Sequence, residues 1–264
     1  MSVIQFASLE WGNSGNQAVV LLHGLYGHKE EWKKIAEALA DDFYLIALDM
    51  PNHGDSAAMP SMSYGNMADA VATELKARGI KDAIFLAHSM SGRVSAILAQ
   101  RQPELVKGLL ILDAPPTGPF MPEDVKKDML DSAVAIRESL DRKFENPEAL
   151  REYMLGKVKE PMVVDYVSTH YSFGEKPGWH VGIEGIEAFT RQGVQEEVPG
   201  GVPCPYLMLK GGASPYSAQF TMEKLKAWKD DAEMVIIEGK GHFIHFQARK
   251  EVIERFREFA KRIV

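Results

Sequence analysis

Short apolar runs alternate with amphipathic segments up to Asp113. The apolar runs predict buried strands at 18–22, 43–48, 83–87 and 109–112. The segments between them carry apolar residues at helical spacing and predict helices over 29–40, 66–78 and 91–100. Strands that are apolar on both faces and alternate with helices are typical of a parallel sheet covered on both sides. We therefore predict an α/β fold with a mostly parallel central sheet.

The alternation stops after Asp113. Residues 115–203 predict helices and no strand, and they are bordered by the loop-forming stretches "PPTGP" and "VPGGVP". Pro122 and Asn146 are typical of helix starts. Strands are predicted again at 206–210 and 234–238, with helices at 220–229 and 251–263. We expect a core made of residues 1–114 and 204–264, with a helical lid, residues 115–203, inserted before the penultimate strand.

Composition narrows the class of protein. The chain has 264 residues and a net charge of −7, which argues against nucleic-acid binding because such proteins usually carry a basic patch. Its single cysteine, Cys204, excludes an intramolecular disulfide and favours a reducing compartment. The start of the chain lacks the pattern of a secretory signal, and no apolar run approaches the length of a membrane span. We expect a cytoplasmic protein that does not insert into membranes.

The stretch "AHSMSG" places Ser89 between a predicted strand and a predicted helix. A nucleophile on a sharp strand-to-helix turn needs small residues two positions away on either side, and Ala87 and Ser91 are both small. Ser91 itself is a poorer candidate, because one of its own flanking residues would be Arg93. The simpler alternative is that Ser89 only caps the following helix.

The loop "HGLYG" follows the first apolar run and could supply one half of an oxyanion hole. Acyl transfer needs backbone amides aimed at the developing negative charge, and a glycine-rich turn provides them. The predicted donors are the amides of Leu25 and Met90. An ordinary glycine turn is the alternative.

A general base is expected in "EGKGHFIH", after the last predicted strand. His242 lies on a glycine turn at the end of that strand, whereas His245 is expected to be packed or solvated within an apolar stretch. The other histidines that we assign to structural roles are His23, His28, His53, His170 and His180. The sequence shows no metal-ligand spacing, so we expect neither a metal nor a cofactor.

Taken in order, "HGLYG", "AHSMSG" and "GKGHF", with helices inserted before the penultimate strand, resemble an α/β-hydrolase over the whole chain. The resemblance implies a Ser–Asp/Glu–His triad in that chain order. Together with "DMPNHGDS" and "GGASPYS", these motifs are similar to a bacterial branch of short-chain carboxylesterases that also hydrolyse acyl-CoA thioesters.

The position of the acid departs from the usual pattern of that family. No Asp or Glu occurs between Pro199 and Met222, and Ser214 stands where a carboxylate is expected. Some members take the acid from the preceding strand, and there the candidate is Asp113. The rival carboxylates are Asp49 and Asp55, which we interpret as turn formers, and Glu238, which is too close to His242 along the chain.

The resulting hypothesis is a serine hydrolase acting on a small-molecule ester or acyl thioester of small to medium chain length. The aromatic residues expected to line its acyl pocket are Tyr26, Phe120, Trp179, Tyr216 and Phe243. Two alternatives stay open. The same residues serve C–C bond cleavage and non-hydrolytic reactions on this fold, and a slow hydrolase can act as a ligand sensor.

Overall fold

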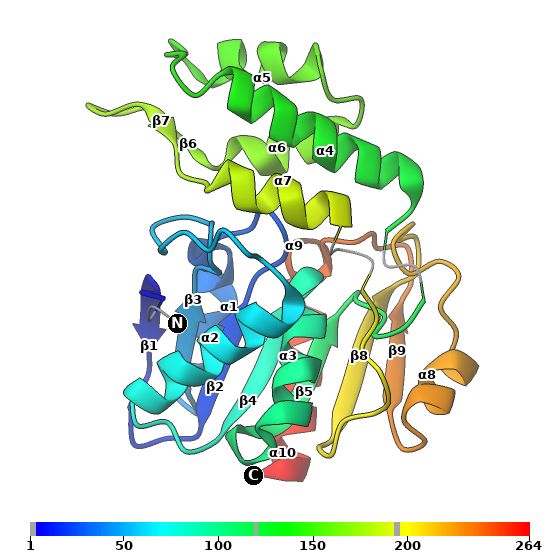
Figure 1. Cartoon of the computed structure of the whole chain (residues 1–264). Helices are drawn as coiled ribbons and strands as arrows, with labels where there is room; N and C mark the ends of the chain where they lie inside the picture. Colours follow the sequence, from blue (N-terminus) through cyan, green and yellow to red (C-terminus); the bar gives the residue numbers. More distant parts are fainter. Residues whose placement is uncertain (1–3, 119–120, 193–195) are drawn as a thin grey trace.

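A seven-stranded sheet forms the centre of the computed structural model, which describes residues 4–118, 121–192 and 196–264. The strand order is β1-β3-β2-β4-β5-β8-β9 (Figure 1). The strands are β1 (Ser8–Trp11), β2 (Ala18–Leu22), β3 (Tyr44–Leu48), β4 (Ala83–His88), β5 (Val106–Leu112), β8 (Tyr206–Gly211) and β9 (Glu233–Ile237). Within this sheet β1 pairs antiparallel with β3, and the other strand pairings are parallel. The predicted parallel α/β sheet is confirmed.

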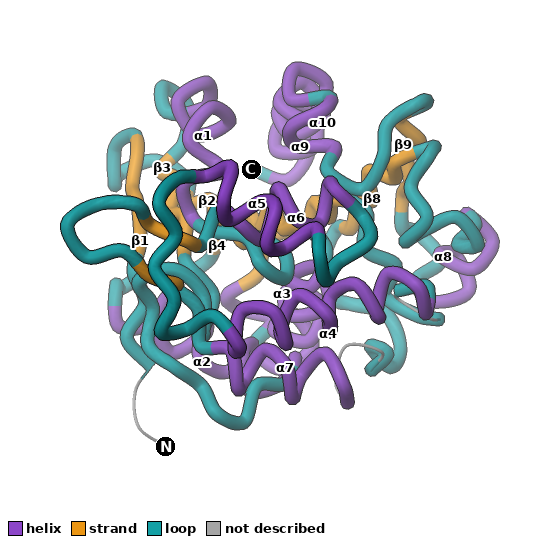
Figure 2. Tube along the Cα trace, turned by 90° about the horizontal axis from the view of Figure 1, so that it is seen from above, coloured by secondary structure: helices purple, strands orange, loops and turns teal. Residues whose placement is uncertain are grey.

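Helices cover both faces of this sheet (Figure 2). Helices α1 and α10 pack against one face with alternate residues of β2, such as Val19 and Leu21. Helices α2, α3 and α8 share the opposite core with Val20 and Leu22. The bounds of the helices in the core are η1 (Lys29–Trp32), α1 (Lys33–Leu39), α2 (Tyr64–Ala77), α3 (Met90–Arg101), η2 (Pro103–Leu105), α8 (Met222–Trp228), α9 (Ile244–Gln247) and α10 (Arg249–Ile263). Burial of both strand faces explains the continuous apolar runs in the sequence.

The segment between β5 and β8, which we name the helical insertion (residues 115–203), lies over the carboxyl ends of the strands (Figure 1). Its elements are α4 (Glu123–Glu138), α5 (Pro147–Leu155), α6 (Pro161–Ser168), β6 (Tyr171–Ser172), β7 (Gly178–Trp179) and α7 (Ile183–Gln192). Asn146 caps α5 by accepting the Ala149 N–H at 2.8 Å. Helix α4 begins one residue later than the sequence indicated, because Pro122 is its N-cap.

Two strand features were missed by the sequence pattern. Strand β1 has four residues, most of them only partly buried, so it produces no apolar run. The expectation that the insertion lacks strands was wrong, since β6 and β7 form a two-residue antiparallel pair. In the parts of the chain that the structure describes, no helix combines the length and apolar character needed to cross a bilayer.

Candidate active site

Ser89 lies on a strained turn between β4 and α3. Its φ is 53° and its ψ is −123°, a conformation that non-glycine residues rarely adopt. A Cβ on Gly92 would lie 2.6 Å from Ile111 Cγ2 and 2.8 Å from the Cβ of Ala114, so only glycine fits there. The Ser91 hydroxyl donates to the His23 carbonyl oxygen. Small residues around Ser89 thus allow the turn to pack against two neighbouring loops.

The three residues predicted to form a triad lie in one hydrogen-bonded chain. Ser89 Oγ is 2.9 Å from His242 Nε2, and His242 Nδ1 is 2.7 Å from Asp113 Oδ2. A carboxylate accepts hydrogen bonds, so the Nδ1 of a neutral His242 carries the proton and its Nε2 accepts from the Ser89 hydroxyl. All three residues are buried.

Asp113 follows β5 with a φ of 50° and accepts hydrogen bonds on both carboxylate oxygens. Besides His242, its donors are the Gly211 N–H at 2.9 Å, the Ser217 hydroxyl at 2.6 Å and the Ser214 hydroxyl. Ser214 stands where the sequence pattern of the family places a carboxylate. It follows β8, and its hydroxyl donates to the carboxylate of Asp113, which follows the neighbouring strand β5. Nothing in the sequence indicated that Ser217 would donate a hydrogen bond to Asp113.

The rival carboxylates lie elsewhere. Asp49 is buried and accepts from the backbone N–H and the ammonium of Lys29, both at 2.7 Å, and from the Asp55 N–H. Asp55 also accepts from the Lys29 ammonium. The side chain of Glu238 is exposed to solvent. Asp49 and Asp55 therefore stabilise the loop after β3.

Two of the predicted aromatic residues surround His242. The ring of Tyr216 stacks on the imidazole with centroids 3.6 Å apart and planes 10° apart. Phe243 contacts the same ring edge-on at 5.4 Å. Burial raises the pKa of the Tyr216 hydroxyl well above its usual value, with Asp113 adding to the effect. The hydroxyl therefore stays protonated beside the carboxylate.

The loop after β2 passes directly against Ser89. A Cβ on Gly24 would lie 2.9 Å from the Cβ of Ser89 and 3.4 Å from its Oγ. The next residue is Leu25, and on the other side of Ser89 the first residue of α3 is Met90. The first N–H groups of a helix have no acceptor within the helix. Both predicted oxyanion donors thus belong to backbone segments next to Ser89.

A small chamber opens beside Ser89. It is lined by Leu25, His88, Ser89, Met121, Met129, Tyr166, Tyr216, His242 and Phe243. Its volume is about 10 Å³, close to the space that a single water molecule requires. The helical insertion closes it with Met129 from α4 and Tyr166 from α6. Neither residue could be identified as a chamber wall from the sequence, because apolar residues at helical spacing are equally typical of a helix that only packs in the core.

Tyr26 and Trp179 were also predicted to line the pocket, but they are not among the residues that line this chamber. Tyr26 is buried under the insertion, where its hydroxyl donates to the Met129 carbonyl oxygen at 3.2 Å. Trp179 packs inside the insertion and donates from Nε1 to the Ser139 hydroxyl at 3.1 Å. Phe120 lies outside the described residues. Of the four aromatic candidates that the structure describes, Tyr216 and Phe243 line the chamber.

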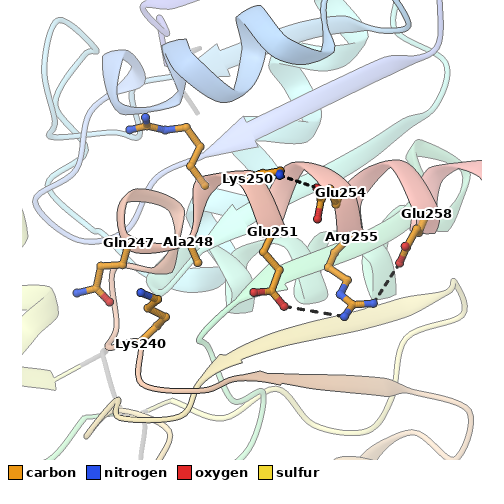
Figure 3. Close-up of a pocket in the computed structure, with 9 residues that line it drawn as sticks. Lys240, Gln247, Ala248, Lys250, Glu251, Glu254, Arg255 and Glu258 are labelled. Carbon is orange, nitrogen blue, oxygen red and sulfur yellow. Dashed lines mark hydrogen bonds and ion pairs between the residues drawn. The ribbon is translucent and has the colours of Figure 1, made fainter.

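A larger hollow of 480 Å³ lies along α10, away from Ser89 (Figure 3). Five of its charged side chains pair with one another: Arg255 with Glu251 and Glu258, and Lys250 with Glu254. A second hollow, of 450 Å³, adjoins the site through Tyr216 and is rimmed by Pro122, among others.

Comparisons with known proteins agree with this fold. The family model described as "alpha/beta hydrolase fold" matches residues 17–248. Esterase YbfF of Escherichia coli is 27% identical over 252 residues, covering 92% of this chain and 93% of that protein. The sn-1-specific diacylglycerol lipase ABHD11 of Mus musculus is 23% identical over 263 residues, covering 94% and 82%. A marine microorganism esterase has a solved structure that superimposes with a TM-score of 0.85 at 26% identity, covering 97% of this chain and 99% of that one. The chain belongs to the α/β-hydrolase fold family, and it resembles the bacterial esterases within it.

Proposed function

We propose that this protein is a serine hydrolase that cleaves carboxylic esters or thioesters through an acyl-enzyme intermediate. The observation that carries the proposal is the chain of hydrogen bonds from Ser89 through His242 to Asp113. The relatives named as esterases and lipases support a hydrolytic reaction. The substrate is a small molecule with an acyl group of small to medium length.

In the first half of the reaction, His242 Nε2 takes the proton of the Ser89 hydroxyl while Oγ forms a bond to the acyl carbon. The amides of Leu25 and Met90 stabilise the negative charge that develops on the carbonyl oxygen. When this intermediate collapses, the bond to the leaving oxygen or sulfur breaks, and the leaving group takes the proton from His242. Ser89 then carries the acyl group as an ester.

Hydrolysis of the acyl-enzyme repeats these steps with water. His242 removes a proton from the water molecule, whose oxygen attacks the acyl carbon, and the same proton then returns to Ser89 as the carboxylic acid leaves. Asp113 holds His242 with Nδ1 protonated and stabilises the imidazolium that forms twice in each cycle. The backbone N–H and hydroxyl donors around Asp113 fix the orientation of its carboxylate toward His242.

The helical insertion acts as a lid in this proposal. A chamber of about 10 Å³ holds no acyl chain, so α4 and α6 must move away from Ser89 when substrate enters. The flexible side chains of Met121 and Met129 line this space and can adapt to the acyl group that enters. Cys204 forms no intramolecular disulfide, which favours the cytoplasm as the compartment of the protein.

The decisive experiment compares wild type with Ser89→Ala on p-nitrophenyl esters from acetyl to palmitoyl and on matching acyl-CoA thioesters. A fluorophosphonate probe followed by peptide mass spectrometry identifies the modified serine. We expect turnover and labelling of Ser89 in wild type, and neither in the variant. Ser95→Ala is the matched control, because Ser95 is a buried serine of α3, the helix that follows Ser89, and it donates to the Ser91 carbonyl oxygen.

Three outcomes would change the assignment. Turnover in Ser89→Ala would overturn the proposed nucleophile. Labelling of Ser89 without ester or thioester hydrolysis would favour C–C cleavage or another reaction on the same residues. Labelling with only a trace of turnover on every substrate would favour a sensor.

A further inference from the structure

A second cluster of buried polar side chains lies behind His242. Glu31 comes from η1, His88 from the end of β4 and His245 from α9, and their exposed fractions are 8%, 1% and 1%. One possible ligand atom from each residue lies within 4.8 Å of those of the other two. The proposed reaction uses none of these three side chains.

Several atoms of this cluster have no hydrogen-bond partner among the described residues. They are Oε1 of Glu31, Nδ1 of His88 and both ring nitrogens of His245. The Nε2 of His245 is 3.5 Å from Glu31 Oε1, beyond hydrogen-bond distance. Because buried polar groups in folded proteins almost always have partners, so many unpaired atoms in one place point to an occupant between them.

We propose that Glu31, His88 and His245 bind a divalent first-row metal ion, with Zn²⁺ as the best fit. Two imidazole nitrogens and one carboxylate oxygen form a ligand set that zinc accepts. Around tetrahedral zinc, bonds of 2.0–2.2 Å place neighbouring ligand atoms about 3.4 Å apart. The His245–Glu31 pair is already at 3.5 Å, and rotations of the imidazole rings can bring the third ligand closer.

Two of the proposed ligands, His88 and Glu31, make further hydrogen bonds of the kind that orient metal ligands. The Nε2 of His88 is 3.0 Å from the His242 carbonyl oxygen, which can only accept, so Nε2 carries the proton and Nδ1 keeps a free lone pair. The Tyr166 hydroxyl donates to Glu31 Oε2 at 3.0 Å and leaves Oε1 available. Metal-binding histidines and carboxylates are usually oriented by such second hydrogen bonds.

The ion would position residues and take no part in bond making. His88 stands between the cluster and the backbone of His242, with the two imidazole centroids 4.6 Å apart. A metal that fixes the His88 ring therefore also fixes the carbonyl group of His242 and the loop that carries it. Metal binding can be measured without any substrate, so the test of this site does not depend on the proposed reaction.

The test uses the full chain, unfolded in urea with a chelator and refolded with Co²⁺, because a buried site fills more readily during folding. Co²⁺ is the probe because it replaces Zn²⁺ and absorbs visible light. We expect one Co²⁺ per chain by elemental analysis, with the intense visible bands of a four- or five-coordinate ion. Glu31→Gln and His245→Gln should each lose the ion and the bands.

His180→Gln is the matched control. His28, Glu30, Asp55 and His180 line an open groove on the surface, where an ion could bind adventitiously. We expect His180→Gln to keep its Co²⁺. No bound ion in refolded wild type, an unchanged ion in Glu31→Gln and His245→Gln, or loss in His180→Gln alone would each overturn the proposal.

A second measurement covers variants that fail to fold. X-ray absorption of Co²⁺-loaded wild type should show two imidazole ligands, and a shell of oxygen atoms alone would overturn the proposal. Zn²⁺ should also raise the melting temperature of wild type, because an ion that binds only the folded state stabilises it.

Discussion

The ring of Tyr216 stacks on the imidazole of His242, with centroids 3.6 Å apart and planes 10° apart. Sequence reasoning placed Tyr216 against the substrate, and the structure shows that it also covers one face of the proposed base. A stacked aromatic ring restricts rotation of the imidazole, which must hold its two hydrogen bonds at 2.7 and 2.9 Å. Tyr216 is thus a positioning residue as well as a wall of the chamber.

Replacing Tyr216 by leucine should lower kcat about tenfold, because aromatic pairs of this kind contribute roughly 0.5–1.5 kcal/mol beyond their buried area. Tyr216→Phe keeps the ring, and we expect its kcat to stay within about threefold of wild type. Steady-state kinetics on a short p-nitrophenyl ester measures both. Equal losses in the two variants would show that the hydroxyl, and not the stacked ring, is the important group.

Asp113→Asn should lower kcat by roughly 10³–10⁴-fold while the protein stays folded, because the amide removes the charge and allows the wrong His242 tautomer. Asparagine tolerates the positive φ found at this position. Ser217→Ala is the comparison, since it removes one neutral donor to Asp113 and should cost less than about tenfold. The pair is measured as kcat together with melting temperature. Near-normal turnover in Asp113→Asn would mean that another group orients His242.

Residues at the ends of apolar strands were predictable, because a parallel sheet brings its carboxyl ends to one edge. This is why Ser89, Asp113 and His242 could be placed together from the sequence. The walls of the chamber could not, since Met129 and Tyr166 lie on amphipathic helices whose orientation depends on tertiary packing. The Glu31–His88–His245 cluster shows the same limit, because no short spacing links ligands drawn from three distant segments.

Acid should destabilise the fold through buried histidines. Burial lowers the pKa of His23, His53 and His170 to about 3, against about 6.5 in the unfolded chain. Between those values the unfolded state binds protons that the folded state does not, so the free energy of unfolding falls as the pH falls. Each such histidine contributes about 1.4 kcal/mol per pH unit to that slope.

His170→Gln isolates one of these groups. The His170 ring contacts His28 and His53, and its Nδ1 faces the His180 carbonyl oxygen. Glutamine does not titrate, so between pH 6 and pH 4 the slope of the unfolding free energy against pH should fall by about 1.4 kcal/mol per pH unit, the equivalent of one proton. Urea unfolding at several pH values measures it. A slope identical to that of wild type would contradict the burial argument.

Met129→Ala should shift the preference for acyl length upward. Met129 closes the chamber from α4, and its truncation opens space beside Ser89. The ratio of kcat/KM for octanoate to that for butyrate should rise in this variant. Met154→Ala is the matched control, because Met154 is equally buried in the insertion but is not among the residues that line the chamber. Both variants should lose about 2–5 kcal/mol of stability, and only Met129→Ala should change the chain-length profile.

Arg93 joins the helical insertion to α3. Its buried guanidinium donates to the carbonyl oxygens of Pro115 and Gly118 at 2.9 Å, and to that of Glu196 at the other end of the insertion. Arg93→Met leaves these carbonyls without their charged donor, so the free energy of unfolding should fall by about 3 kcal/mol or more. Arg93→Lys should recover little of it, because an ammonium cannot reproduce the fork of the guanidinium.

The measurements are urea unfolding and limited proteolysis, with cleavage expected to accelerate at both borders of the insertion in Arg93→Met. Arg101→Met is the control on the same helix: Arg101 is exposed and binds Asp69 and the Gly65 carbonyl oxygen, a surface contact worth less than about 1 kcal/mol. If Arg93→Met lost stability without faster cleavage at the borders, Arg93 would support the core alone. Faster cleavage at both borders would instead identify Arg93 as the residue that fixes the insertion above Ser89.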